Sequence, residues 1–294
     1  MITFLFEQYG YYPKDLSKDN SFEIDNWLFR LIEIEYEDSF IESVDRYITE
    51  LRDYFEAKGS FIIKTRFNKK VSIYDGKRYV LVSVNKCNMS LQDLNKLHCA
   101  FIEKDKYVDL NNLFATWEER ISIIDAEAVS SLRIDSVYYK NNIEITMFCL
   151  GLAQNALQYL SEVILDYDKK VENVTITHKR LKNLNSFDFW NPFNLIIDHP
   201  LRDLVELYKN DFIQFDELLY LFEYYNMEIK TASLFMARLL YPGEIFDRLD
   251  DNIKEKSTSF KLVYNIEREM QKIKKVYLYL KDKYGIRPII WLEN

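Results

Sequence analysis

The segment from Thr175 to Lys209 contains the residue types that phosphoryl transfer requires, except that one of them is replaced by a different residue. Transfer from a nucleotide uses an Asp to orient the acceptor hydroxyl, an Asn five residues later to bind a metal ion, and a further Asp that also holds metal. His178, Asn185 and Asp198 fit this spacing, but Arg180 stands where the Asp that acts as base is expected. Because a guanidinium cannot accept a proton near neutral pH, the sequence predicts a reaction centre without its base.

Three of these residues have a functional and a structural interpretation, and the sequence leaves both open. His178 either orients a catalytic loop or makes an ordinary hydrogen bond in the interior. Arg180 either pairs with Asp198, which would reduce the tendency of that carboxylate to bind Mg²⁺, or lies on the solvated surface. Asn185 stands in an Asn-rich stretch and either binds metal or has no role in the site.

The fourth residue, Asp198, closes an apolar run and precedes His199-Pro200. It therefore lies at the end of a buried element, where it either faces a metal ion or opens the next helix, since Pro is favoured at the first helical position. On that helix, Arg202 and Asp203 are expected to brace the helix against the preceding loop.

Composition and charge limit the classes of partner. The chain has 294 residues, of which 48% are hydrophobic, so it can bury a core in one large domain or in two lobes. The formal net charge is −8, with 39 basic and 47 acidic residues interspersed. Because binding to phosphate backbones requires a positive surface, we expect no nucleic-acid partner.

The cysteines, the N-terminus, the longest uncharged run and the glycines bear on cellular location, membrane spans and phosphate binding. Three cysteines at no metal spacing and an N-terminus without a basic region predict a cytoplasmic protein without a signal peptide. The longest uncharged run, 145–161, has 17 residues and contains polar amides, so it is too short to be a typical transmembrane helix. The six glycines are scattered, and none forms the glycine-rich loop that brings backbone amides close to phosphates.

The hydrophobic pattern changes near residue 90, which predicts an α+β fold in two parts. Residues 1–88 are expected to form an N-lobe of strands and one helix, and residues 89–294 a larger helical C-lobe. Asp25-Asn26 and Asp75-Gly76 are expected turns, and Gly59 is expected to cap a helix. The predicted strands lie within 22–36, 61–65, 70–74 and 78–84, and the predicted helices at 40–58, 91–103, 110–136, 143–168, 200–209, 213–225, 230–240 and 259–284.

Six segments in order along the chain carry a resemblance to a known group. They are IKTRFNKKVSIYDGKRYVLVSV at 63–84, LNKLH at 94–98, GLAQNALQYL at 151–160, IDHPLRDLVE at 197–206, MARLLYPGEIFD at 236–247 and GIRPIIWL at 285–292. The ordered set resembles the spore-coat kinase-like proteins of Gram-positive spore formers, a divergent branch of the aminoglycoside and choline phosphotransferase superfamily.

The resemblance implies a two-lobed protein-kinase-like fold with a cleft near residues 85–90. It would place His178, Arg180, Asn185 and Asp198 at the floor of that cleft. No lysine stands on the early strand to pair with phosphates, so Arg30 is the nearest cation and the only candidate for binding a cofactor.

The departures from the active pattern favour one function over two others. We expect a catalytically inactive kinase-like protein that binds protein partners as a scaffold, is associated with the forming spore coat and needs no cofactor. The alternative is a residual phosphotransferase acting on a hydroxyl group, with ATP, Mg²⁺ held by Asp198 and Asn185, and Asp188 as the base. The third hypothesis is an unrelated α+β module.

Overall fold

The structure is a computed structural model that describes residues 1–56 and 58–293. The chain divides into two compact units. The first comprises Met1–Leu97 and Leu181–Ile196, and the second comprises His98–Arg180 and Ile197–Asn294. The first unit therefore extends past the predicted boundary after residue 88, and it takes in a later segment that the sequence analysis had assigned to the helical lobe.

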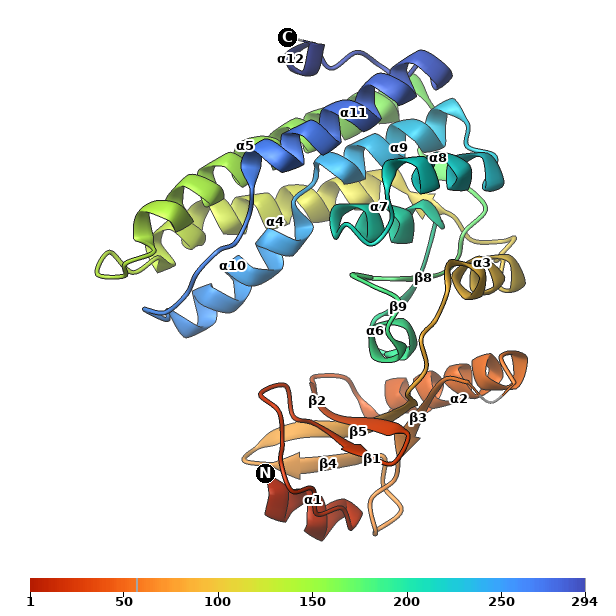
Figure 1. The fold of residues 1–294 in the computed structure, drawn as a ribbon, viewed down its shortest axis with the longest axis vertical. Helices are drawn as coiled ribbons and strands as arrows, with labels where there is room; N and C mark the ends of the chain where they lie inside the picture. The colour runs from red at the N-terminus through yellow and green to blue at the C-terminus, as the bar shows by residue number, and fades with distance from the viewer. Residues whose placement is uncertain (57, 294) are drawn as a thin grey trace. The chain divides into compact units, whose positions relative to one another are not determined.

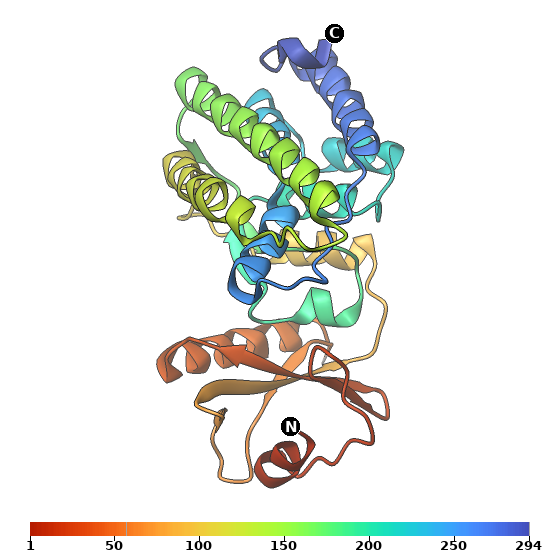
Figure 2. The ribbon, with the colours of Figure 1, turned by 90° about the vertical axis from the view of Figure 1, so that its left-hand side faces the viewer.

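The first unit is built on a five-stranded antiparallel sheet in the order β1-β2-β5-β3, with β4 also paired to β5. Helices α1 and α2 lie on opposite faces of this sheet (Figures 1 and 2). The elements are α1 (Ile2–Tyr9), β1 (Ser21–Ile24), β2 (Trp27–Ile34), α2 (Asp38–Tyr54), β3 (Ser60–Ile63), β4 (Val71–Tyr74), β5 (Lys77–Asn85) and the short α6 (Ser186–Trp190). Helix α3 (Leu91–Ala100) follows β5.

Both predicted turns of the first unit are confirmed. Asp25-Asn26 joins β1 to β2, with Ile24 opposite Trp27. Asp75 and Gly76 join β4 to β5 with φ angles of 50° and 73°, as a two-residue hairpin loop requires. The predicted helix cap at Gly59 is wrong, because α2 already ends at Tyr54; residue 57 lies outside the described residues.

An aromatic cluster explains why α1 forms, although the sequence analysis did not predict it. Helix α1 packs its apolar side chains on the face of the sheet that carries alternate residues of β1, β2 and β5. The buried members are Phe4, Leu5, Tyr9, Phe22, Phe29, Leu31, Tyr79 and Leu81. A helix of eight residues is marginal alone, so burial against these strands stabilises it.

The second unit is helical. Helix α5 packs against α4 and α9, and α9 also packs against α7 and α11 (Figure 1). The helices are α4 (Leu110–Ser131), α5 (Tyr139–Asp166), α7 (Leu201–Lys209), α8 (Phe215–Tyr224), α9 (Ile229–Leu240), α10 (Gly243–Glu255), α11 (Ile266–Tyr284) and α12 (Ile290–Glu293). Two small sheets complete the fold: β6 (Val108–Asp109) with β7 (Lys170–Val171), and β8 (Thr175–His178) with β9 (Leu195–Asp198).

The α+β class with a small sheet and many helices is confirmed. Among the described residues, helices α1, α6, α10 and α12 were not predicted. Helix α10 falls between the predicted helices 230–240 and 259–284, with Pro242 as its N-cap and Gly243 as its first residue. The predicted helix at 259–284 begins later, at Ile266. Within the described residues, no helix is both long and apolar enough to cross a membrane.

Candidate functional site

Strand β8 ends at His178, and a buried carboxylate of α7 fixes its position. Asp203 accepts hydrogen bonds from the backbone N–H of His178 at 2.9 Å and from His178 Nδ1 at 2.8 Å, and it lies 3.0 Å from His98 Nε2. Burial acts to raise the pKa of Asp203, but the two histidines outweigh it and hold the pKa well below its ordinary value. The carboxylate therefore stays ionised and anchors the segment that leads to Arg180.

Arg202, one residue earlier on α7, completes this anchor. Its guanidinium donates to the backbone oxygens of His178 and Lys179, at 2.9 and 3.1 Å, and to the carboxylate of Asp198 at 2.9 Å. Arg202 and Asp203 thus hold the end of β8 from two sides, and their expected role in bracing the helix against the loop is confirmed.

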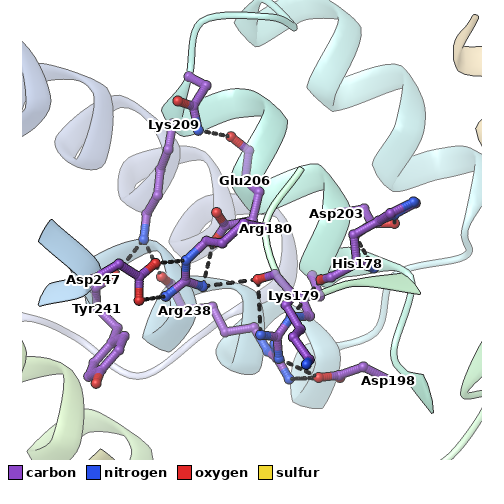
Figure 3. Close-up of polar contacts among 12 residues, drawn as sticks. His178, Lys179, Arg180, Asp198, Asp203, Glu206, Lys209, Arg238, Tyr241 and Asp247 are labelled. Atoms are coloured by element: carbon purple, nitrogen blue, oxygen red, sulfur yellow. Dashed lines mark hydrogen bonds and ion pairs between the residues drawn. The ribbon is translucent and has the colours of Figure 1, made fainter. Parts of the chain in front are cut away.

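Arg180 lies between two acidic side chains, one from α10 and one from α7 (Figure 3). Its Nε donates to Asp247 Oδ2 at 2.7 Å, and its Nη1 lies 3.4 Å from Glu206 Oε1. Burial acts to lower the pKa of Arg180, but the two carboxylates raise it above its ordinary value. Arg180, which the sequence analysis placed where a base is expected, is therefore a permanent cation.

Asp198, at the end of β9, does not have Arg180 as the ion-pair partner that one interpretation of the sequence expected. Both of its oxygens accept from Nη2 of Arg238, at 2.7 and 2.9 Å (Figure 3). Oδ2 also accepts from Arg202. Burial acts to raise the pKa of this carboxyl, yet the two guanidiniums hold it below its ordinary value. A cation could bind Asp198 only by displacing at least one of them.

The remaining predicted residues belong to the first unit, where Asn185 is the N-cap of α6. Its side-chain oxygen accepts from the backbone N–H of Asp188 at 2.8 Å, and its amide donates to the Asp188 carboxylate at 2.8 Å. Capping therefore already uses both polar atoms of the Asn185 side chain.

Arg30 lies on β2 in the same unit. It pairs with Asp19 at 2.6 Å, and its guanidinium lies 3.7 Å from the centre of the Phe187 ring. Arg30, Lys86, Asn185 and Asp188 all line one cavity of about 420 Å³. The structure thus brings the predicted cofactor-binding cation and the predicted Asn together in one unit.

The residues present do not fit nucleotide-bound Mg²⁺. Two guanidiniums bind Asp198, and Asn185 serves as a cap. Across the described residues, no group of three or more His, Cys, Asp or Glu side chains is arranged to hold a metal ion. The turn between β1 and β2 is Asp25-Asn26, without glycine, so it lacks the residues with which kinases cover phosphates.

The sequence analysis missed the ion partners of this site. Glu206, Arg238 and Asp247 bind the residues that it had selected, and Gly243 leaves room for Arg180. A signal for Arg238 existed, since it interrupts the apolar half of α9, and a cation in such a position needs a buried anionic partner.

The small antiparallel sheet, the helical second unit and the anchored β8 segment define a kinase-like phosphotransferase fold. The family described as "Spore coat putative kinase YutH" matches residues 2–279, and the chain belongs to this family. Its relative, the endospore coat-associated protein YutH of Bacillus subtilis (strain 168), is 29% identical over 150 residues. That match covers 47% of this chain and 40% of the relative, so the chain matches less than half of the curated relative's length.

One solved structure supports the fold. Spectinomycin phosphotransferase APH(9)-Ia, in complex with ADP and spectinomycin, is similar with a TM-score of 0.51 and 11% identity, over 95% of this chain and 93% of that one. An aminoglycoside phosphotransferase from Alicyclobacillus acidocaldarius has a TM-score of 0.49 and 8% identity, over 91% and 93% of the two chains. At such low identity, the first similarity concerns the fold alone.

Proposed function

We propose that this chain is a kinase-like protein that no longer transfers phosphoryl groups and that acts by binding protein partners in the spore coat. The observation that carries the proposal is the state of Arg180. Arg180 is ion-paired with Asp247 and Glu206 and remains positively charged. In this proposal it takes the place of the catalytic base. A group in this state cannot accept the proton of an attacking hydroxyl.

The neutralised metal ligand supports the same proposal. A carboxylate that already binds two guanidiniums has little negative charge to offer Mg²⁺, and displacing Arg238 would leave a buried cation unpaired. Family membership and the coat-associated relative support a place at the spore coat. In this proposal the protein is made in the cytoplasm and joins the forming coat through other proteins.

Binding and transfer are tested separately. Calorimetric titration of the full chain with ATP and Mg²⁺ is expected to give no saturable heat at millimolar nucleotide, and incubation with radiolabelled ATP is expected to release no phosphate. A micromolar isotherm that requires Mg²⁺ would contradict the proposal. A fluorescent fusion in sporulating cells tests the second half, and uniform fluorescence through sporulation would contradict a coat role.

The alternative is a residual phosphotransferase, and one observation favours it. Asp203 still anchors the β8 segment through His178, as a working loop would require. In that case Asp188 would be the base, and Asp198 and Asn185 would bind Mg²⁺ with ATP. Asp188→Asn would then abolish transfer, whereas Asp135→Asn, which changes an exposed carboxylate in a surface ion pair, would leave transfer intact. Equal activity in both variants would exclude Asp188 as the base.

A further inference from the structure

The second unit contains a cavity of about 170 Å³ that is rich in arginine. Arg120 of α4, Arg180, Arg202 of α7 and Arg238 of α9 all line it. The stacked side chains of Trp117 and Tyr241 also line it. Their ring centroids are 4.2 Å apart, and their ring planes are nearly parallel.

The carboxylates that balance these arginines are placed unevenly. Of the four acidic partners, Glu206 lines the cavity, whereas Asp198, Asp247 and Asp250 bind the guanidiniums without being part of its lining. The charges of the four arginines and four carboxylates balance, but the residues that line the cavity include four arginines and one glutamate. A small anion inside it would therefore lie among more positively than negatively charged residues.

Two lining residues have donors that remain unsatisfied. Among the residues that the structure describes, the Arg238 Nε and the Tyr241 hydroxyl are buried and have no hydrogen-bond partner. A buried donor without an acceptor is costly. Gly243, the first residue of the 13-residue helix α10, also lines the cavity, and helix N-termini attract anions.

We propose that this cavity binds phosphate, either as the free ion or as the phosphate group of a monoester. Arginine forks match the geometry of phosphate oxygens, and the volume corresponds to about six water molecules in the liquid, enough for one such group. The Trp117–Tyr241 stack adds an apolar wall for the organic part of an ester. This inference goes beyond the proposed function, because it concerns only the second unit and holds whether or not the protein transfers phosphate.

The test uses the full chain and follows the fluorescence of Trp117. This signal is the difference in tryptophan fluorescence between the wild type and the variant Trp117→Phe. Sodium phosphate and phenyl phosphate are titrated against sodium chloride at equal ionic strength. Both phosphates are expected to give saturable changes, and tighter binding of phenyl phosphate would indicate an ester as the natural ligand. Arg120→Gln is expected to weaken binding by about tenfold or more, the effect of losing one charged hydrogen bond.

A second variant keeps the arginines intact. Thr116 lines the cavity from the exposed side of α4, and Ser122 lies on the same helix outside the lining; both hydroxyls donate to the carbonyl four residues earlier. Thr116→Glu is expected to weaken phosphate binding by about tenfold through like-charge repulsion, with Ser122→Glu unchanged. No saturable signal beyond that of chloride, or equal effects of the two glutamates, would overturn the proposal.

Discussion

The guanidinium of Arg180 occupies the space that any side chain on residue 243 would need. A Cβ atom built on Gly243 would lie 2.3 Å from Arg180 Nη2, closer than real Cβ contacts come. Arg180 cannot move away freely, because Asp247, four residues further along α10, and Glu206 hold it. The observed position of Arg180 is therefore compatible with glycine at residue 243 and not with alanine.

We predict that Gly243→Ala destabilises the protein by about 1–2 kcal/mol, because overpacking against Arg180 outweighs the helix propensity gained. Chemical denaturation measures the effect. Gly151 is a matched control, since it also lies in a helix and a Cβ there would meet nothing within 4 Å. Gly151→Ala is expected to stabilise by up to about 1 kcal/mol.

The double variant isolates the contact. In an Arg180→Gln background, Gly243→Ala should lose its penalty, giving a coupling free energy of about 1 kcal/mol or more between the two sites. A coupling near zero would show that the arginine moves aside without cost.

Placing an acid at position 180 is not expected to give a working site. Arg180→Asp would place a third carboxylate beside Asp247 and Glu206, which the arginine now neutralises. We expect a loss of about 2–4 kcal/mol in the free energy of unfolding and no phosphate transfer from ATP. Arg133→Asp, at an exposed arginine paired with an exposed carboxylate, should change stability little. If Arg180→Asp transferred phosphate from ATP and Arg133→Asp did not, the rest of the site would be functional.

Local patterns made most of the secondary structure predictable. The turns Asp25-Asn26 and Asp75-Gly76 combine residues that tolerate positive φ with flanking apolar runs, so the strands around them could be predicted. Helix α1 was not predicted, since its short apolar sequence is stabilised by residues of distant strands. Helix α10 was missed because Pro and Gly at its start are also typical of loops.

The candidate site was predictable in its residue types but not in its pairing. The interpretation of Arg180 as the residue in place of the base rests on spacing within one short segment and stays a prediction. Its partners could not be recognised, since Asp247 is 67 positions away along the chain and contacts Arg180 only when α10 packs near the end of β8. The same holds for Arg238, which is 40 positions from Asp198. Ion pairs of this kind follow from packing, which sequence spacing does not encode.

Asp198 provides a direct test of the buried ion pair. Asp198→Asn would leave the Arg238 guanidinium buried without an anion, and we expect a loss of about 3–5 kcal/mol in the free energy of unfolding. Adding Arg238→Met should recover part of that loss, because the uncompensated charge is then removed. Asp135→Asn serves as an exposed control and should have little effect. If Asp198→Asn were neutral, Asp198 would not neutralise Arg238 as the structure indicates.

We predict that the buried His199, next to Asp198, lowers the free energy of unfolding in mild acid. Burial, only partly offset by Asp198, lowers the pKa of His199 from 6.5 to about 4. Between these values the unfolded chain binds a proton that the folded protein does not, so the free energy of unfolding falls as the pH drops from about 6.5 to 4. The full pKa difference corresponds to roughly 3 kcal/mol.

The variant His199→Asn separates this contribution from the others. An asparagine oxygen can still accept the backbone N–H of Leu201, which His199 Nδ1 accepts at 3.3 Å, but it does not titrate. Denaturation at a series of pH values should show a shallower loss of stability between pH 6.5 and 4 in His199→Asn than in the wild type. The buried His98, whose pKa is also lowered by burial, contributes in the same direction in both proteins and cancels in the comparison. Asp198, with its lowered pKa, loses its stabilising charge only at lower pH, so identical slopes in this window would show that His199 is not held neutral.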